Sequence, residues 1–275
     1  MSAELRVLVC QLTSVDEVEA NFKQIHKLLE SISLSEKVDL VCLPENALYM
    51  RLKEGEKIEG LALDSQVFRE LEELSQKRKL SIHIGSVPLL TQGKLRNASV
   101  LVELGSGRRK SYEKIHLFDI ELENQKKISE SDVFSHGLTP EIFSLSDWQI
   151  GQAICYDLRF SELFSAYANL EADLILVPAA FLVETGKVHW EVLLRARAIE
   201  SQCYIVAAAQ AGTHQGLQGD QRATFGNSLV IDPWGRVLWR GSPDRVECQL
   251  IVLQKSEITK TRRQIPMRNH RRLSR

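Results

Sequence analysis

A cysteine at the end of an apolar run is the residue in this chain with the clearest potential for chemistry. Cys155 lies in GQAICYDLRF (residues 151–160), where a predicted buried strand reaches the thiol and a helix begins within a few residues. A thiol in that position is exposed enough to react, and the positive end of a helix favours the nucleophilic thiolate. The backbone N–H groups after it are suited to hold an oxyanion. A buried structural cysteine is the simpler alternative, because free cysteine is among the most buried residue types.

Two charged residues also follow predicted apolar strands. Glu45 comes directly after Leu43 and Pro44, at the end of a strand so apolar that a charge there needs a purpose. Lys114, within RKSYEKIHLF (residues 109–118), ends another strand before an aromatic stretch. Taken singly, each is most simply a solvated charge at a strand end. Together with the thiol, they favour a catalytic interpretation.

Several familiar reaction centres have motifs that this chain lacks. It contains no GxSxG, GxGxxG, P-loop, HExxH or CxxC pattern. Its seven histidines, at positions 26, 83, 116, 136, 189, 214 and 270, share no metal-ligand spacing. We therefore expect neither a metal nor an organic cofactor. The net charge of −1 gives the chain as a whole no electrostatic footprint for nucleic acid.

Strands alternate with amphipathic helices along the chain and must position these residues. Apolar side chains recurring every three or four positions predict helices over residues 18–32, 65–77, 161–170 and 188–201. Strands are predicted over residues 6–12, 38–43, 81–87, 98–104, 109–112, 148–155, 173–177, 204–209, 228–231, 237–240 and 247–253. Continuous apolar strands flanked by helices imply sheets covered on both faces. The excess of strands over helices favours an α/β fold in which two sheets pack face to face, with helices outside.

The composition and the cysteines bound the class of protein. With 44% hydrophobic and 26% charged residues and no linker rich in Pro, Gly or Ser, residues 1–275 are predicted to form one domain. The chain has five scattered cysteines, Cys10, Cys42, Cys155, Cys203 and Cys248. They form no pattern of disulfide pairs, which favours a reducing compartment. We expect no signal peptide and no membrane span, because no apolar stretch approaches ~20 residues. The expected location is the cytoplasm, so the sequon at Asn97-Ala98-Ser99 is interpreted as accidental.

The three candidate residues lie in motifs that resemble the nitrilase superfamily, also called the carbon–nitrogen hydrolases. These are LPEN around Glu45, YEKIHLFDIEL around Lys114 and GQAICYDLRFSEL around Cys155, in that order. The resemblance runs from VLVCQL near the N-terminus to RRQIPMRNHRR near the C-terminus. HWEVLLRARAIESQCYIVAAAQ and FGNSLVIDPWG resemble the Nit subgroup, and within it the deaminated glutathione amidases, with the ω-amidases next. The resemblance implies a four-layer αββα sandwich and a homodimer in which helix layers of two subunits pack together.

The resemblance and the chemistry together assign roles to these residues. Glu45 is expected to take the thiol proton and later to activate water, as a general base must. Cys155 is expected to attack the amide carbon and form a thioester. Lys114 and the N–H of Tyr156 are expected to stabilise the oxyanion. Glu130, in ISES, stands where the family has a second glutamate, although its charged surroundings and the absence of the usual Pro-Gly also fit an ordinary loop acid.

The expected substrate is an amide whose acyl group is an α-keto acid. Deaminated glutathione, split by water to 2-oxoglutarate and Cys-Gly, is the leading interpretation, and 2-oxoglutaramate or another short ω-amide is the alternative. Arg159 is expected to clamp a carboxylate, unless it lies on a helix surface or a dimer interface. Phe181 and Thr185 match positions that line this pocket in relatives. Nitrile or carbamoyl substrates, a silent binding or scaffold protein, and a glutamine-amide-feeding domain are less favoured.

Four features depart from the family pattern or remain open. Ser161 stands where relatives usually have Pro, and Asn227 where Nit proteins often have His. Residues 213–222 (THQGLQGDQR) form a longer segment than usual and are expected to reshape the mouth of the pocket. The C-terminal segment, residues 255–275, is basic through Lys260, Arg262, Arg263, Arg268, Arg271, Arg272 and Arg275. A nucleic-acid arm is one interpretation of it, but its match to the family favours packing on the domain or on a partner subunit.

Overall fold

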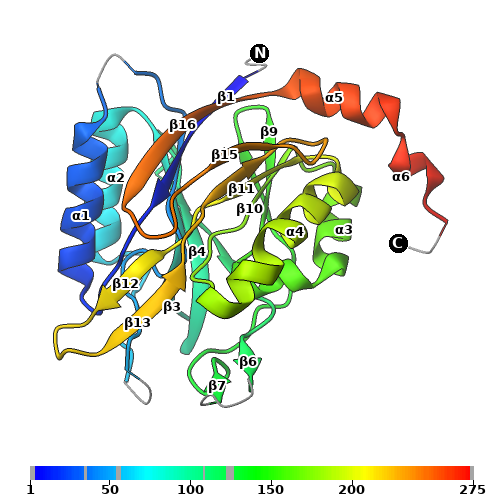
Figure 1. The fold of residues 1–275 in the computed structure, drawn as a ribbon. Coiled ribbons are helices and arrows are strands. Elements are labelled where there is room, and N and C mark those ends of the chain that lie inside the picture. The colour runs from blue at the N-terminus through cyan, green and yellow to red at the C-terminus, as the bar shows by residue number, and fades with distance from the viewer. Residues whose placement is uncertain (1–3, 34–35, 54–56, 108, 122–126, 273–275) are drawn as a thin grey trace.

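Two six-stranded sheets pack face to face, and helices cover the outer side of each (Figure 1). The computed structural model describes residues 4–33, 36–53, 57–107, 109–121 and 127–272. The αββα sandwich predicted from the sequence is confirmed. None of the helices in these ranges combines the length and apolar character needed to cross a membrane.

The inner strands of the first sheet are apolar on both faces, as their continuous hydrophobic runs predict. In spatial order it contains β16 (Glu247–Gln254), β1 (Glu4–Gln11), β2 (Leu40–Cys42), β3 (Ser81–Thr91), β4 (Lys94–Val102) and β5 (Arg109–Glu113). Successive side chains of a strand point to opposite faces. Val7 and Val9 therefore join the core between the sheets, whereas Leu8 and Cys10 pack beneath α1 (Val18–Ser31) and α2 (Gln66–Arg78).

The second sheet carries the other helix layer. Its strands, in spatial order, are β15 (Val237–Arg240), β14 (Leu229–Ile231), β11 (Tyr204–Ala207), β10 (Leu174–Leu176), β9 (Trp148–Gln152) and β8 (Ile142–Leu145). β9, β10 and β11 are parallel, so their carboxyl ends meet at one edge of the sheet. α3 (Ser161–Asn169) and α4 (Val183–Ser201) cover its outer face (Figure 1).

Several elements differ from the sequence prediction. The strand expected over residues 148–155 ends at Gln152, and a short 3₁₀ helix, η1 (Cys155–Arg159), follows. Residues 213–222 belong to a hairpin of β12 (Ala211–Gln215) and β13 (Gln221–Phe225). α4 begins at Val183 rather than near residue 188, where Gly186 had obscured the helical pattern. That glycine is needed because a Cβ would lie 2.3 Å from the ring of Phe225.

The remaining elements lie at the margins of the sandwich. β6 (Asp119–Ile120) pairs with β7 (Ile128–Ser129), and α5 (Lys255–Gln264) leads to α6 (Met267–His270). The Arg262 guanidinium donates to the carbonyl oxygen of Ala172 at 2.6 Å, and Arg271 donates to Asn169 Oδ1 at 3.2 Å. Part of the basic C-terminal segment is therefore used in contacts with the chain around α3. Arg275 falls outside the described residues.

Two buried histidines join parts of the fold that are distant in sequence. His83 on β3 has Nε2 2.9 Å from Gln152 Oε1 on β9, which links the two sheets. His214 on β12 has Nδ1 2.7 Å from the carbonyl oxygen of Ser14 and Nε2 2.8 Å from Thr224 Oγ1. Burial lowers the pKa of His83, and likewise that of His214, to about 4. Both rings are therefore neutral at pH 7.

These histidines predict a loss of stability in mild acid. Below pH 6.5 each of these histidines is protonated in the unfolded chain, whereas in the folded chain it stays neutral down to about pH 4. The free energy of unfolding should fall in that window by up to about 1.4 kcal/mol per pH unit for each histidine. Denaturant unfolding at pH 7.5, 6.5, 5.5 and 5.0 should show a shallower dependence for His83→Gln than for the wild type. His270→Gln, at an exposed position, should keep the wild-type slope; identical slopes in all three proteins would contradict this account.

Candidate active site

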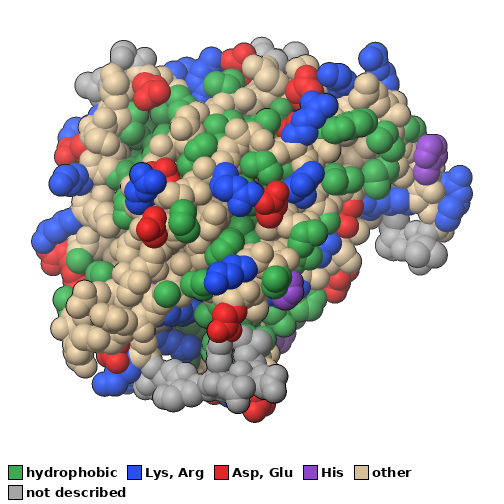
Figure 2. Space-filling model, viewed as in Figure 1, with side chains coloured by type: hydrophobic (Ala, Val, Ile, Leu, Met, Phe, Trp, Pro, Cys, Tyr) green, Lys and Arg blue, Asp and Glu red, His purple; other side chains and the backbone are tan. Residues whose placement is uncertain are grey.

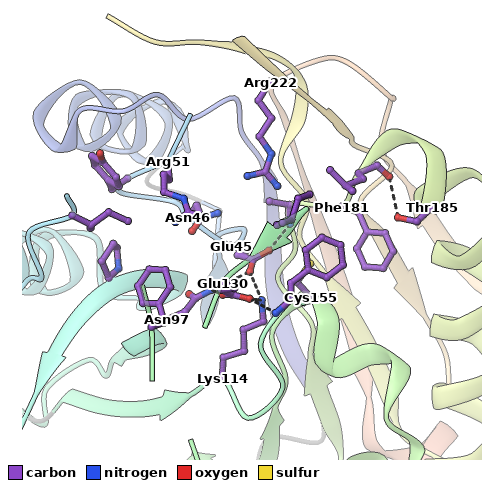
Figure 3. Close-up of a pocket in the computed structure, with 18 of the residues that line it drawn as sticks. Glu45, Asn46, Arg51, Asn97, Lys114, Glu130, Cys155, Phe181, Thr185 and Arg222 are labelled. Atoms are coloured by element: carbon purple, nitrogen blue, oxygen red, sulfur yellow. Dashed lines mark hydrogen bonds and ion pairs between the residues drawn. The ribbon is translucent and has the colours of Figure 1, made fainter. Parts of the chain in front are cut away.

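Three strand ends bring the candidate residues together. β3 runs antiparallel to β4 and β4 to β5, so β5 points in the same direction as β2. Glu45 therefore follows β2 at the edge where Lys114 follows β5. Cys155 follows β9 in the facing sheet, and all three side chains meet at one cavity (Figure 3).

The cavity opens to solvent on one side. About 680 Å³ of space lies within it and in its mouth. Of the residues predicted from the sequence, Glu45, Lys114, Glu130, Cys155, Arg159, Phe181 and Thr185 line it. The side chain of Tyr156 does not. Its ring instead packs edge-on against Phe118 and Phe160.

A buried ammonium group lies between two carboxylates on the floor of the cavity (Figure 3). Lys114 Nζ is 3.0 Å from Glu45 Oε1 and 2.8 Å from Glu130 Oε2. Asn97 Nδ2 donates to the same two groups, at 3.2 Å to Glu45 and 2.7 Å to Glu130. Burial alone would lower the pKa of Lys114, but Glu130 and Glu45 outweigh it and hold that pKa above its ordinary value. The lysine is therefore charged at every physiological pH.

The backbone around Glu45 is fixed by contacts from both sheets. The N–H of Ala180, after β10, donates to Glu45 Oε2 at 2.8 Å. Gln210 Nε2, after β11, donates to the Glu45 carbonyl oxygen at 2.9 Å. Gly85 on β3 allows the strand-end loop to cross closely, because a Cβ there would lie 2.4 Å from the backbone of Pro44. The carboxylate is thus held in one orientation toward the cavity.

Cys155 adopts a backbone conformation that is rare outside glycine. Its φ of 47° lies in the left-handed region, as in the sharp turns that present nucleophiles. Its N–H donates to the carbonyl oxygen of Pro178, after β10, at 2.9 Å. The side chain is 8% exposed and lines the cavity, so the thiol is mostly buried and open only toward the pocket.

The resting thiol is also protonated, contrary to the sequence prediction of a favoured thiolate. Burial raises the pKa of Cys155 well above its ordinary value, and the negative charge of Glu45 adds to this effect, whereas Lys114 opposes it. η1 has only five residues, so it supplies little of the helix dipole on which the sequence argument rested. Deprotonation must therefore accompany the reaction rather than precede it.

Asp157 connects the thiol turn to the lysine loop and was missed from the sequence. It is fully buried and accepts a hydrogen bond from Tyr112 Oη at 2.8 Å and from the Ile154 N–H at 2.9 Å. The N–H of His116, two residues after Lys114, donates to it at 2.9 Å. The acid two positions after the cysteine in an apolar stretch was the available signal.

Arginines dominate the remaining polar lining. The Arg159 guanidinium lies 4.8 Å from the ring centre of Phe181 and 5.1 Å from that of Tyr156, so it is stacked between two aromatic side chains. Arg51 and Arg222 also line the cavity and were not predicted. Within the described ranges, no group of three or more His, Cys, Asp or Glu side chains could hold a metal ion.

Comparison with known proteins identifies the family. The family model for carbon–nitrogen hydrolases matches residues 6–263. The chain belongs to the carbon–nitrogen hydrolase family. It is thus a hydrolase of carbon–nitrogen bonds other than peptide bonds, as the sequence motifs predicted.

Similarity extends over nearly the whole of this carbon–nitrogen hydrolase. It is 36% identical over 274 residues to the human deaminated glutathione amidase, covering 97% of this chain and 82% of that one. It is 34% identical to the nitrilase and fragile histidine triad fusion protein NitFhit of Caenorhabditis elegans, covering 97% of this chain but only 60% of the fusion protein.

Two solved structures have the same fold as this hydrolase. The C. elegans NitFhit crystal structure superposes with a TM-score of 0.86 at 32% identity, over 98% of this chain and 65% of that one. Saccharomyces cerevisiae Nit3, a member of branch 10 of the nitrilase superfamily, superposes with a TM-score of 0.82 at 25% identity. That match covers 99% of this chain and 98% of Nit3.

The hydrogen bonds of Asp157 predict a large effect on stability. Asp157→Ala removes an acceptor from buried donors on three segments, which should lower the free energy of unfolding by about 3 kcal/mol or more. Urea unfolding of this hydrolase at pH 7 measures the change. Asp132→Ala, at an exposed position, should change it by less than about 0.5 kcal/mol. Equal losses in the two variants would show that the buried network is not stabilising.

Proposed function

We propose that this hydrolase cleaves amides through a thioester on Cys155, with Glu45 as general base and Lys114 as oxyanion donor. The observation that carries the proposal is their meeting at one cavity, with the Lys114 ammonium 3.0 Å from the Glu45 carboxylate. A nucleophile, a proton acceptor and a fixed positive charge are the groups that acyl transfer requires.

Acylation begins from a neutral thiol. Glu45 accepts the Sγ proton as Sγ attacks the carbonyl carbon of the amide, because the raised pKa of Cys155 disfavours a standing thiolate. The carbonyl oxygen becomes an oxyanion that accepts hydrogen bonds from Lys114 Nζ and the N–H of Tyr156. The C–N bond then breaks, Glu45 gives its proton to the departing nitrogen, and the acyl group stays on sulfur.

Deacylation uses the same groups with water in place of the amine. Glu45 takes a proton from water while the oxygen attacks the thioester carbon, and Lys114 again faces the oxyanion. The C–S bond breaks, the carboxylic acid leaves, and the proton returns to Sγ. Glu130 and Asn97 are positioning residues in both steps, because their hydrogen bonds hold the Lys114 ammonium and the Glu45 carboxylate in place.

We propose deaminated glutathione as the substrate, with 2-oxoglutarate and Cys-Gly as products. The names of relatives at 31–37% identity over nearly the full chain support it. Arg159 is suited to bind the carboxylate of the α-keto acid, since arginine matches carboxylates in a bidentate manner. Phe181 and Thr185 lie on the α4 side of the cavity, where they can flank the acyl chain (Figure 3).

We also propose that the whole chain is one carbon–nitrogen hydrolase domain, working as a homodimer in the cytoplasm. The cysteines are all free thiols, which suits a reducing compartment and a thiol nucleophile. α4 leaves Val188 66%, Val192 61% and Ile199 47% exposed along a shallow groove. Figure 2 shows hydrophobic side chains over α4 among basic and acidic ones. Such a face is suited to a second copy of itself.

The nucleophile assignment predicts a complete dependence of turnover on one thiol. Cys155→Ala should lower kcat/KM for deaminated glutathione by about 10³-fold or more, whereas Cys248→Ala should retain it. Steady-state assays measure this, and acid-quenched wild-type enzyme should carry the 2-oxoglutaryl group on the peptide that contains Cys155. Turnover by Cys155→Ala near the wild-type rate would refute the mechanism. Wild-type turnover of other amides alone would refute only the substrate.

If the exposed apolar face of α4 forms the homodimer interface, a single charged substitution in that face should weaken the dimer. The wild type should have the mass of a dimer in light scattering coupled to gel filtration. Val192→Glu should shift it toward the monomer, because an unpaired charge in an apolar contact is costly. Leu138→Glu, at a residue 81% exposed elsewhere on the chain, should remain dimeric. A monomeric wild type, or a dimer unaffected by Val192→Glu, would refute this interface.

A further inference from the structure

The described residues that line the cavity carry more positive than negative charge. Four cationic side chains, Lys114, Arg51, Arg159 and Arg222, face two carboxylates, those of Glu45 and Glu130. Both carboxylates already contact the lysine. The three arginines are therefore available for an anionic ligand.

The arginines occupy separate positions. Arg159 comes from η1 and is stacked against Phe181. Arg222 comes from β13 and Arg51 from the loop after β2; in Figure 3 the Arg222 guanidinium points down toward Glu45 and Arg51 lies beside Asn46. No ion pair joins Arg51 or Arg222 to an acidic residue in the described part of the chain. A guanidinium in a cavity that has no carboxylate within ion-pair distance is suited to bind one from the ligand.

Arg222 lies on the β12–β13 hairpin, which forms one wall of the cavity and is held in place by its own contacts. It stands directly opposite His214 in the register of the β12–β13 hairpin. The buried His214 ring contacts the carbonyl oxygen of Ser14, in the loop after β1, through Nδ1, and Thr224 Oγ1 on β13 through Nε2. At the hairpin tip the N–H of Leu217 donates to Asp16 Oδ1 at 3.0 Å. The hairpin is therefore anchored at both ends, and little ordering is required of it when a ligand binds.

The electrostatics of this wall favour an anion. Burial lowers the pKa of Arg222 even though the charge of Glu45 opposes the shift, and the neighbouring Arg51 lowers it further. Two guanidinium groups that repel each other in a partly buried place gain most from a carboxylate between them. Glu45 and Glu130 do not fill that role, because Lys114 and Asn97 already engage them.

We propose that Arg222, with Arg51, binds a carboxylate on the leaving amine, so that the substrate class is amides with an anionic group on both sides of the scissile bond. Arg159 binds the acyl side and the Arg222 wall binds the amine side. This rests on the proposed function, in which the amine-side group is the terminal carboxylate of Cys-Gly. It makes the enzyme selective against ω-amides that release only ammonia.

The test compares two substrates that share an acyl group. kcat/KM is measured for deaminated glutathione and for 2-oxoglutaramate with the wild type, Arg222→Gln, Arg222→Lys and Arg51→Gln. Arg222→Gln should lower the ratio of the two values, deaminated glutathione over 2-oxoglutaramate, by about 10- to 100-fold. Arg222→Lys should lower it less, because the charge remains and the fork is lost. Arg236→Gln, an exposed arginine on another turn, should leave the ratio unchanged.

A modified substrate identifies the group that is bound. Deaminated glutathione with its terminal carboxylate converted to the amide should react more slowly with the wild type, by about the same factor as Arg222→Gln on the parent substrate. That variant should no longer distinguish acid from amide. Equal losses on both substrates, or a wild type indifferent to the terminal carboxylate, would overturn the inference alone. Absence of wild-type turnover of both parent substrates would overturn the proposed function itself.

Discussion

The ammonium group of Lys114 is 2% exposed, and a charge so far from water persists only where opposite charge surrounds it. The carboxylates of Glu45, at the end of β2, and Glu130, after β7, provide that surrounding, and Asn97 on β4 donates hydrogen bonds to both of them. Removal of either carboxylate would leave the buried ammonium charge only partly compensated. The requirement therefore ties the geometry of the site to the integrity of the first sheet.

The second sheet supplies what the first cannot. The thiol and the N–H of Ala180 reach the cavity from the ends of β9 and β10, and the latter fixes Glu45 across the interface between the sheets. His83 and Gln152 join the sheets within the same interface. The site is thus formed at the seam of the sandwich. Reactivity of the thiol depends on sheet packing as much as on its own turn.

The layers of the fold were predictable because each strand and helix has a hydrophobic period that can be read locally. Glu45, Lys114 and Cys155 could be selected because polar or reactive residues follow apolar strands. Asn97 could not, since its partners lie 33 and 52 positions away and nothing in its own strand reveals them. The hairpin that carries Arg222 was also missed, because its residues are polar and its stability comes from the contacts of His214 with a distant loop.

The thiol environment was predicted with the wrong sign for a related reason. A sequence reveals that a helix follows a cysteine, but it does not reveal that the helix is a single short turn or that Glu45 lies beside the sulfur. Burial and a neighbouring carboxylate then determine the protonation state.

The left-handed backbone of Cys155 has a consequence for how this protein can change over time. A side chain at φ 47° costs about 1–2 kcal/mol that glycine would not incur. Mutational drift at this position is therefore drawn toward glycine, which would relax the turn and abolish the thiol. Only continuing selection for the reaction can retain cysteine there. A lineage that no longer needed the reaction would be expected to keep the folded αββα sandwich but to lose the cysteine at position 155.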